Sequence, residues 1–242
     1  MELRGARCLV TGASSGIGQA AALRLAAAGA DVLALGRNRA ALELVGGTAI
    51  VCDLLDPAQV ERAVAEAGAV DVLVNNAGIG WFGPLAELEP AALERLVRVN
   101  LLAPVLLTRA LLPGMLARGR GHVVNVGSIV GRVGGKHEAA YAATKGGLVA
   151  FTESLRQELD GTGVRVSLVT PGAIATDFFE RRGEPYVRRF PRPLAADKAA
   201  AAIVAAIADD RAEVFVPRWL ALPPRVQSLL PGLYRALAAR FG

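Results

Sequence analysis

The chain has 242 residues, of which 53% are hydrophobic and 20% are charged, and its net charge is +5. A chain of this length can bury the core of one α/β domain. It contains no uncharged apolar run of about 18 residues, so we expect no membrane span. Its first residues lack the basic, apolar and small-residue order of a signal peptide, so we expect a cytoplasmic protein.

The net charge is concentrated in the last quarter of the chain. Residues 1–179 contain 16 Lys or Arg and 16 Asp or Glu, whereas residues 180–242 contain 11 and 6. No basic stripe alternates with aromatic residues, and no zinc-finger spacing occurs. We therefore expect neither a nucleic-acid partner nor a metal site.

Short apolar runs typical of strands alternate with longer stretches of helical periodicity. The predicted strands are 6–10, 31–36, 48–52, 71–76, 122–128, 164–170 and 213–217. The predicted helices are 16–29, a short one over 38–45, then 57–68, 90–117, 139–160 and 197–209. Several strands are continuously apolar, as expected of parallel strands covered on both faces. This alternation predicts a doubly wound α/β fold of the Rossmann type, in a single domain over 1–242.

A glycine-rich turn, TGASSGIG (11–18), follows the first predicted strand. Gly12, Gly16 and Gly18 would let the backbone approach a pyrophosphate, and the helix that begins here would present free N–H groups. The spacing is GxxxGxG and not GxGxxG, and ordinary turns also use glycine. Its place directly after the first strand favours a nucleotide site.

The second predicted strand ends at Gly36 and Arg37, where NAD-binding domains usually carry an acidic residue. The next acidic residue is Glu43. Because an arginine pairs with a 2′-phosphate and an acid would repel it, we expect NADP(H) in preference to NAD(H). The alternative is that Arg37 is a solvated residue at a helix start.

Asp53 follows the third predicted strand. In this place it could accept a hydrogen bond from an adenine amino group. It could equally be an N-cap or turn residue before Pro57.

Tyr141 and Lys145, in YAATK, are four residues apart in the predicted helix 139–160. At this spacing they lie on one face of the helix. A nearby ammonium group favours the phenolate, so Lys145, together with the positive charge of a bound nicotinamide, would lower the pKa of Tyr141 from about 10 towards neutrality. The pair predicts a general acid/base, with two surface residues as the alternative.

Taken in order, the motifs resemble those of the short-chain dehydrogenase/reductase family, in its common single-domain branch. They are TGASSGIG (11–18), NNAG (75–78), Asn100, Ser128, YAATK (141–145) and PG (171–172). The resemblance covers about residues 6–217 and implies a seven-stranded parallel sheet of order 3-2-1-4-5-6-7. In that order a strand separates Cys8 from Cys52, so we expect two buried free thiols about 10 Å apart.

The resemblance also implies the site residues. The implied catalytic residues are Asn100, Ser128, Tyr141 and Lys145. The implied cofactor-binding residues are Gly12, Ser14, Ser15, Gly16, Ile17, Gly18, Arg37, Asp53, Leu54, Asn76, Ala77, Gly78, Tyr141, Lys145, Pro171, Gly172, Ile174 and Thr176. Residues 76–78 would line the adenosine side, and Thr176 with the backbone of 171–174 would hold the nicotinamide carboxamide.

The implied reaction interconverts a ketone or aldehyde and an alcohol, with Tyr141 as the proton donor or acceptor. Lys145 would also hold the nicotinamide ribose, and Ser128 would bind the substrate oxygen, unless it only caps a strand. Asn100 would hold a water that links Lys145 to solvent, unless it only satisfies a helix distortion. A catalytically inactive nucleotide-binding regulator is the alternative function. Family members are often homo-oligomers, through the helices that carry Asn100 and Tyr141.

Residues 177–196 interrupt the alternation, and we expect them to form a long mobile substrate loop. The aromatic residues that could line a lipophilic pocket, or simply pack loops on the core, are Trp81, Phe82, Phe178, Phe179 and Tyr186. The arginines that could bind an anionic substrate are Arg181, Arg182, Arg188 and Arg189. We expect His122 at a sheet edge or in a loop, and His137 in a loop, either solvated or at the substrate mouth.

The segment 218–242 extends beyond the last predicted strand. Its apolar residues at helical spacing are Val226, Leu229, Leu230, Leu233, Leu237 and Phe241, and Arg225, Arg235 and Arg240 flank them. The chain's own cleft, another subunit or an anionic membrane surface could cover this face. The segment lacks the glycine-rich ending of the bacterial fatty-acid ketoreductases and is more similar to relatives that act on bulkier lipophilic alcohols and ketones.

Overall fold

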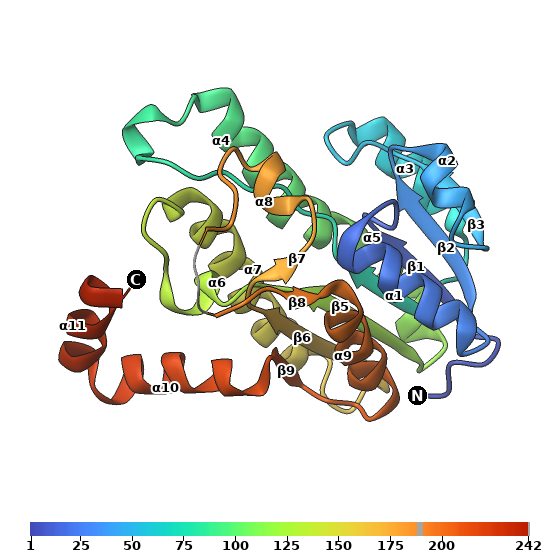
Figure 1. Ribbon diagram of the computed structural model, residues 1–242. Helices are drawn as coiled ribbons and strands as arrows, with labels where there is room; N and C mark the ends of the chain where they lie inside the picture. The colour runs from blue at the N-terminus through green and yellow to red at the C-terminus, as the bar shows by residue number, and fades with distance from the viewer. Residues whose placement is uncertain (188–190, 242) are drawn as a thin grey trace.

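The computed structural model describes residues 1–187 and 191–241, without the side chains of 239–241. Arg188, Arg189 and the side chains of Arg240 and Phe241 therefore lie outside the described residues. At the centre is a seven-stranded sheet of order β3-β2-β1-β4-β5-β6-β9 (Figure 1). Because β9 is the seventh strand of this sheet along the chain, the predicted order is confirmed.

Every pair of adjacent strands in the sheet is parallel. The strands are β1 (Arg7–Thr11), β2 (Asp31–Gly36), β3 (Thr48–Val51), β4 (Val72–Asn75), β5 (Gly121–Val126), β6 (Val164–Pro171) and β9 (Glu213–Val216). A separate pair joins β7 (Ile174–Ala175) to β8 (Leu194–Ala195). The predicted strands lie within two residues of these bounds, because each has a continuous apolar run.

Helices cover both faces of the sheet (Figure 1). One face packs against α1 (Gly16–Ala27) and α9 (Ala196–Ala208), and the other against α3 (Pro57–Ala67), α5 (Ala103–Ala117) and α7 (Ala139–Glu158). A short helix, α2 (Arg39–Glu43), lies beside β2 and β3. Successive strand residues point to opposite faces, so both must be apolar, which is why the strands show no polar alternation.

The long helix predicted over 90–117 is interrupted. It consists of α4 (Pro90–Val97), a π-helical turn η2 (Arg98–Leu102) and α5. By length and composition alone, the whole stretch of 28 residues could cross a membrane, with a mean hydropathy of 1.6 in its most apolar window. In the structure its residues Leu107, Leu111 and Met115 are part of the core beneath the sheet, so it serves as a core helix.

Short helices occur outside the helices predicted from the sequence. They are η1 (Leu85–Glu87), α6 (Val130–Val133) and α8 (Phe178–Arg181). The expected loop over 177–196 thus contains a helix and the strand β8. After β9 follow η3 (Arg218–Ala221), α10 (Leu222–Leu229) and α11 (Pro231–Phe241), which leave the sheet and turn towards α6 (Figure 1).

The prediction for His122 was wrong. This residue lies in β5, between β4 and β6, and its side chain is fully buried. Its Nε2 lies 2.8 Å from Ser167 Oγ, and burial lowers the pKa of His122 to about 4. A histidine beside an apolar run suggests the edge of a sheet, but strands β4 and β6 cover His122 from both sides. The prediction for the cysteines is confirmed, since Cys8 and Cys52 are free and buried.

Candidate active site

A cleft of about 580 Å³ opens at the carboxyl ends of the strands, where ligands bind in open α/β sheets. Its lining comes from the segments that follow β1, β2, β3, β4, β5 and β6, together with α7 and the α8 region. All the catalytic and cofactor-binding residues predicted from the sequence line this cleft, except Gly18 and Asn100.

The turn after β1 depends on its glycines. Gly12 and Gly16 have φ values of +68° and +58°, which side chains rarely allow. A Cβ on Gly18 would lie 2.3 Å from the carbonyl oxygen of Gly12, and one on Gly16 would lie 3.1 Å from Thr176 Cγ2. The turn and the segment after β6 therefore meet closely, and Ser14, Ser15 and Ile17 border the open cleft.

Thr11 and Asn76 join the turn to the end of β4. Asn76 Nδ2 donates to the carbonyl of Thr11 at 2.9 Å, and the amides of Asn76 and Ala77 donate to Thr11 Oγ1 at 3.0 Å. These bonds hold the segment 76–78 across the base of the cleft.

Asn75 supports the sheet from below, a role that the sequence analysis missed. Its Nδ2 donates to Asn125 Oδ1 at 2.9 Å and to Thr108 Oγ1 at 3.2 Å, and Asn125 Nδ2 donates to Thr152 Oγ1 at 2.9 Å. All four side chains are buried. They link β4 and β5 to α5 and α7, the helix of Tyr141. The first asparagine of the NNAG motif, Asn75, was the feature of the sequence that could have indicated this role.

Arg37 and Asp53 border the cleft after β2 and β3. The Arg37 side chain is exposed and has no hydrogen-bond or ion-pair partner within the described part of the chain. Asp53 Oδ1 accepts from the amide of Leu55 at 3.0 Å, whereas Asp56 caps α3. Asp53 is thus a turn residue and not the N-cap, and its contact with adenine stays a prediction.

Tyr141, Lys145 and Ser128 meet at the end of β5. Tyr141 and Lys145 are buried on the face of α7 that borders the cleft, and Ser128 hydrogen-bonds to Tyr141. Lys145 Nζ donates to the carbonyl oxygen of Val126 at 2.9 Å. A Cβ on Gly78 would lie 3.6 Å from Lys145 Nζ, so the amine borders the cleft where residue 78 leaves room.

Burial dominates the electrostatics of Tyr141 in the chain without a cofactor. It raises the pKa of Tyr141 above its usual value, and a hydrogen bond with Ser128 opposes this. Burial also lowers the pKa of Lys145 to about 8. The predicted lowering of the Tyr141 pKa by Lys145 and by the charge of a bound nicotinamide concerns the complex with the cofactor and stays a prediction. The phenol is a neutral proton donor in this state.

Asn100 lies behind Lys145, in the π-helical turn. Its Oδ1 accepts from the amide of Ile79 and its Nδ2 donates to the carbonyl of Ile79, each at 2.9 Å. Nδ2 also donates to Thr144 Oγ1 at 3.2 Å. The turn thus directs Asn100 towards the backbone after β4 and towards α7. Its predicted role in a water relay is not tested by these contacts.

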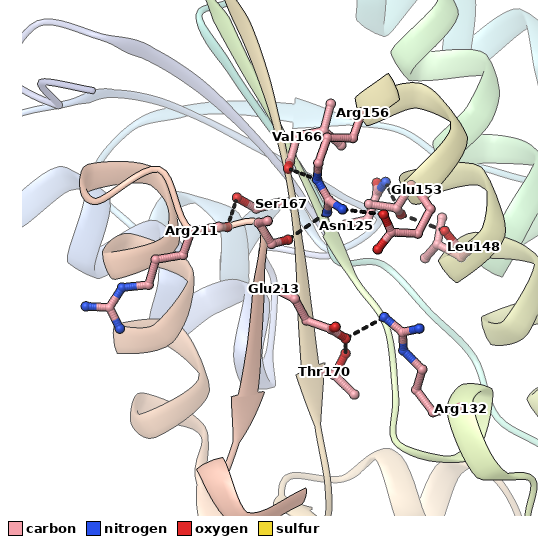
Figure 2. Close-up of polar contacts among 12 residues, drawn as sticks. Asn125, Arg132, Leu148, Glu153, Arg156, Val166, Ser167, Thr170, Arg211 and Glu213 are labelled. Carbon is pink, nitrogen blue, oxygen red and sulfur yellow. Dashed lines mark hydrogen bonds and ion pairs between the residues drawn. The ribbon is translucent and has the colours of Figure 1, made fainter. Parts of the chain in front are cut away.

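An ion pair fixes the segment that carries Ser128. Figure 2 shows Arg132 of α6 pointing to Glu213 of β9, with Nη2 2.6 Å from Oε1, and Thr170 donates to the same oxygen at 3.3 Å. The amide of Ile129 donates to the carbonyl of Pro171 at 3.0 Å. Strands β6 and β9 therefore hold the backbone on both sides of Ser128.

Aromatic rings from the α8 region cover the end of the cleft beside Tyr141. The Phe178 ring lies 5.5 Å from the Tyr141 ring, and Phe179 lies 4.9 Å from Tyr186. A Cβ on Gly80 would lie 2.7 Å from Phe178 Cζ, so α8 packs directly on the loop after β4. Trp81 is different, because it packs with Leu96 and Tyr141 behind the cleft wall.

A buried ion pair, also missed from the sequence, joins α8 to α7. Arg182 Nη1 lies 2.5 Å from Glu138 Oε1, and the two side chains are 7% and 14% exposed. The guanidinium carbon of Arg182 lies 4.7 Å from the ring centres of both Phe82 and Phe179. Arg181 instead donates to Ser15 Oγ at 3.2 Å. Of the four arginines named as possible anion ligands, these two are already in contact with the protein.

Comparison with known proteins identifies the family. A family model described as short chain dehydrogenase matches residues 6–186. The chain belongs to the short-chain dehydrogenase/reductase family. It is 39% identical over 186 residues to the ketoacyl reductase HetN of Nostoc, a match that covers 72% of this chain and 65% of that relative.

Solved structures of the short-chain dehydrogenases agree with the fold. One from Burkholderia cenocepacia in complex with NADP has a TM-score of 0.87 and 29% identity, covering 98% of this chain and 99% of that one. One from Burkholderia phymatum in complex with NAD has a TM-score of 0.84 and 26% identity, covering 96% of each. Both nucleotides thus occur among the dehydrogenases of this shape.

The residues of the cleft fit a dinucleotide. The glycine turn leaves space at the N-terminus of α1 that a Cβ would fill, where a pyrophosphate could approach the backbone. The Lys145 amine and the Arg37 guanidinium lie at separate points along the cleft and could bind different parts of the same nucleotide. Within residues 1–187 and 191–241, no group of three or more His, Cys, Asp or Glu could hold a metal ion.

Proposed function

We propose that the protein is an NADP(H)-dependent oxidoreductase that interconverts a ketone or aldehyde and the corresponding alcohol. The observation that carries this proposal is that Tyr141 and Ser128 both border the cleft at the end of β5, beside the buried amine of Lys145. Membership of the family and the similarity to a ketoacyl reductase support it.

The nicotinamide cofactor, when bound, supplies or accepts a hydride. The chain's own residues orient the substrate and move the proton. The Tyr141 hydroxyl, neutral because of burial, donates its proton to the oxygen of a carbonyl during reduction and takes it back during oxidation. Ser128 hydrogen-bonds the same substrate oxygen and stabilises the charge that develops there. Lys145 binds the nicotinamide ribose, and Asn100 connects Lys145 to solvent through a water.

NADP(H) is the preferred cofactor in this proposal. Arg37 is exposed at the cleft and free of a protein partner among the described residues, so it is available for a 2′-phosphate. No acidic side chain follows β2 to repel that phosphate before Glu43. Asp53 would bind the adenine, and Thr176 with Pro171, Gly172 and Ile174 would hold the carboxamide end.

A lipophilic substrate fits the far end of the cleft better than an anion. Phe82, Phe178, Phe179 and Tyr186 line that end. Arg182 is neutralised there by Glu138 and is not available to a second anion. In this proposal, residues 177–196 form the substrate segment at this end of the cleft. The whole chain is a single nucleotide-binding domain, and residues 218–242 extend it. A cytoplasmic homo-oligomer, assembled through the helices of Asn100 and Tyr141, belongs to the same proposal.

A panel of substrates tests the proposal. NADPH absorbance is followed with apolar ketones, aldehydes, steroids, retinoids and acyl thioesters, and with carboxylate-bearing ketones as the polar control. Turnover is expected with apolar ketones and NADPH. Tight NADPH binding without turnover of any compound would favour the alternative, a catalytically inactive nucleotide-binding regulator.

A further inference from the structure

The segment 218–241 has an inner face that packs on the protein and an outer face that does not. On the inner face, Leu220 lines the cleft, and Tyr234 Oη donates to the carbonyl of Val133 in α6 at 3.4 Å. Val226 is half-buried. The segment is therefore a docked part of the molecule, and Figure 1 shows α10 and α11 forming one end of it.

The outer face is apolar and exposed. Leu229 is 79% exposed, Leu233 51% and Leu237 45%. Leu233 and Leu237 are one turn apart on α11, so they stand side by side on its surface. The chain's own cleft, one of the three covers considered from the sequence, does not cover these leucines.

The charge of the segment is of one sign. Residues 218–242 contain four arginines and no acidic residue. Arg218, Arg225 and Arg235 form no ion pair within the described part of the chain. Arg225 lies four residues before Leu229 on the same side of α10, whereas Arg235 lies across α11 from Leu233 and Leu237. The segment as a whole therefore combines exposed leucines with unpaired arginines, and it is complementary to a surface that is both apolar and anionic.

A second copy of the chain fits this face poorly. In a two-fold contact the same patch occurs on both sides, so two segments of like positive charge would face each other. No acidic residue of the segment is available to compensate. An anionic phospholipid bilayer instead offers headgroups to the arginines and acyl chains to the leucines.

We propose that the segment 218–241 binds the surface of an anionic phospholipid bilayer through Leu229, Leu233 and Leu237, with Arg225 and Arg235 on the headgroups. Helix α6 and Leu220 connect the segment to the cleft that holds Tyr141. Bound in this way, the protein would have its substrate end close to the bilayer, where apolar ketones and alcohols accumulate.

Co-sedimentation of the full chain with vesicles tests the proposal without any use of activity. The protein is expected to pellet with vesicles of phosphatidylcholine and phosphatidylglycerol, and to stay in solution with phosphatidylcholine alone. High salt should release it, because the headgroup attraction is screened. If the protein stays in solution with both kinds of vesicle, the proposal is wrong.

Three variants separate the contributions of the leucines and the arginines. Leu233→Ser combined with Leu237→Ser should abolish pelleting, and Arg225→Gln with Arg235→Gln should weaken it by roughly fivefold for each arginine. The matched control is Leu44→Ser, since Leu44 is 76% exposed on another surface and should have no effect. Retention of NADPH binding and of the melting temperature shows that each variant is folded.

Light scattering after gel filtration tests the competing occupant. The proposal expects the same oligomeric state for the intact chain and for the double leucine variant. If that variant loses a subunit contact and the intact chain does not bind vesicles, a second copy covers the face and the bilayer does not.

Discussion

The nucleotide end and the substrate end of the cleft are built in different ways. The nucleotide end is shaped mainly by backbone groups. Gly12 and Gly16 have positive φ, and the carbonyl of Gly12 leaves no room for a Cβ at Gly18. The amides of residues 76 and 77 donate to Thr11. At the substrate end, ring contacts and the Glu138–Arg182 ion pair join segments that are far apart in the sequence. The nucleotide end thus depends mainly on backbone geometry, and the substrate end on side-chain contacts.

The largest expected effect on turnover comes from Tyr141, which lies where the nucleotide end and the substrate end of the cleft meet. Tyr141→Phe removes the proton donor and keeps the ring that packs on Phe178. Turnover should fall about a thousandfold, as for the loss of a general acid, while the dissociation constant of NADPH stays unchanged. Steady-state kinetics and fluorescence titration measure the two quantities. Turnover close to that of the unmodified protein would show that Tyr141 is not the acid.

Lys145→Met should reduce turnover about a hundredfold, because the amine no longer supports proton transfer and ribose binding. It should also stabilise the fold. The pKa of Lys145 is lowered from 10.5 to about 8, so charging this buried amine costs about 3 kcal/mol in the folded state.

The pH dependence follows from the sign of that shift. Below about pH 8 the lysine is protonated in both states and the whole cost applies, and as pH rises towards 10.5 the folded state has already lost the proton and the cost disappears. Urea unfolding should therefore show the gain from Lys145→Met near neutral pH and little gain above pH 10.5. Lys136→Met, at an exposed lysine, is the control. An equal gain at every pH would contradict a titrating Lys145.

A change confined to the nucleotide end should alter cofactor choice alone. Arg37→Ala is expected to raise the KM for NADPH about twentyfold and leave the KM for NADH unchanged, since only NADPH carries the 2′-phosphate. Arg39→Ala, two residues on and paired with Glu43, is the matched control. A parallel rise of both KM values would mean that Arg37 supports the loop and does not select the cofactor.

A change confined to the substrate end should have the smallest effect. Removing one partner of Glu138–Arg182 would leave a buried charge, so both are changed, as Glu138→Gln with Arg182→Met. The KM for an apolar ketone should rise about fivefold, because α8 is held less firmly over Tyr141, whereas the NADPH dissociation constant should stay constant. The control is Arg24→Met with Asp197→Asn, an exposed pair between α1 and α9. Equal changes in both constants would place the pair in support of the whole fold.

The same contrast explains what the sequence could predict. The strands follow from apolar runs, and their order and most of the cleft residues from Gly12 to Thr176 follow from the resemblance of the motifs to those of the family. The Asn75–Asn125 bond and the Glu138–Arg182 pair each join residues more than 40 positions apart, so no local pattern indicates them. The short helices α6 and α8 are held by such contacts too.

One prediction failed because burial was not visible in the sequence. His122 was expected at a sheet edge or in a loop, yet both neighbouring strands cover it. Burial also opposes the expected lowering of the Tyr141 pKa, because desolvation raises the pKa of a phenol as buried as Tyr141. Spacing predicts which side chains share a face, and not how much water reaches them.

The π-helical turn at Arg98–Leu102 limits how this protein can be engineered. Each residue turns a regular helix by about 100°, so an extra residue in one turn offsets the faces of α4 and α5. Deleting a residue there would make the helix more regular and rotate one of these faces out of its packing. Asn100 would then no longer point at the backbone of Ile79. Helix-favouring changes in this turn are therefore poor choices for raising thermal stability.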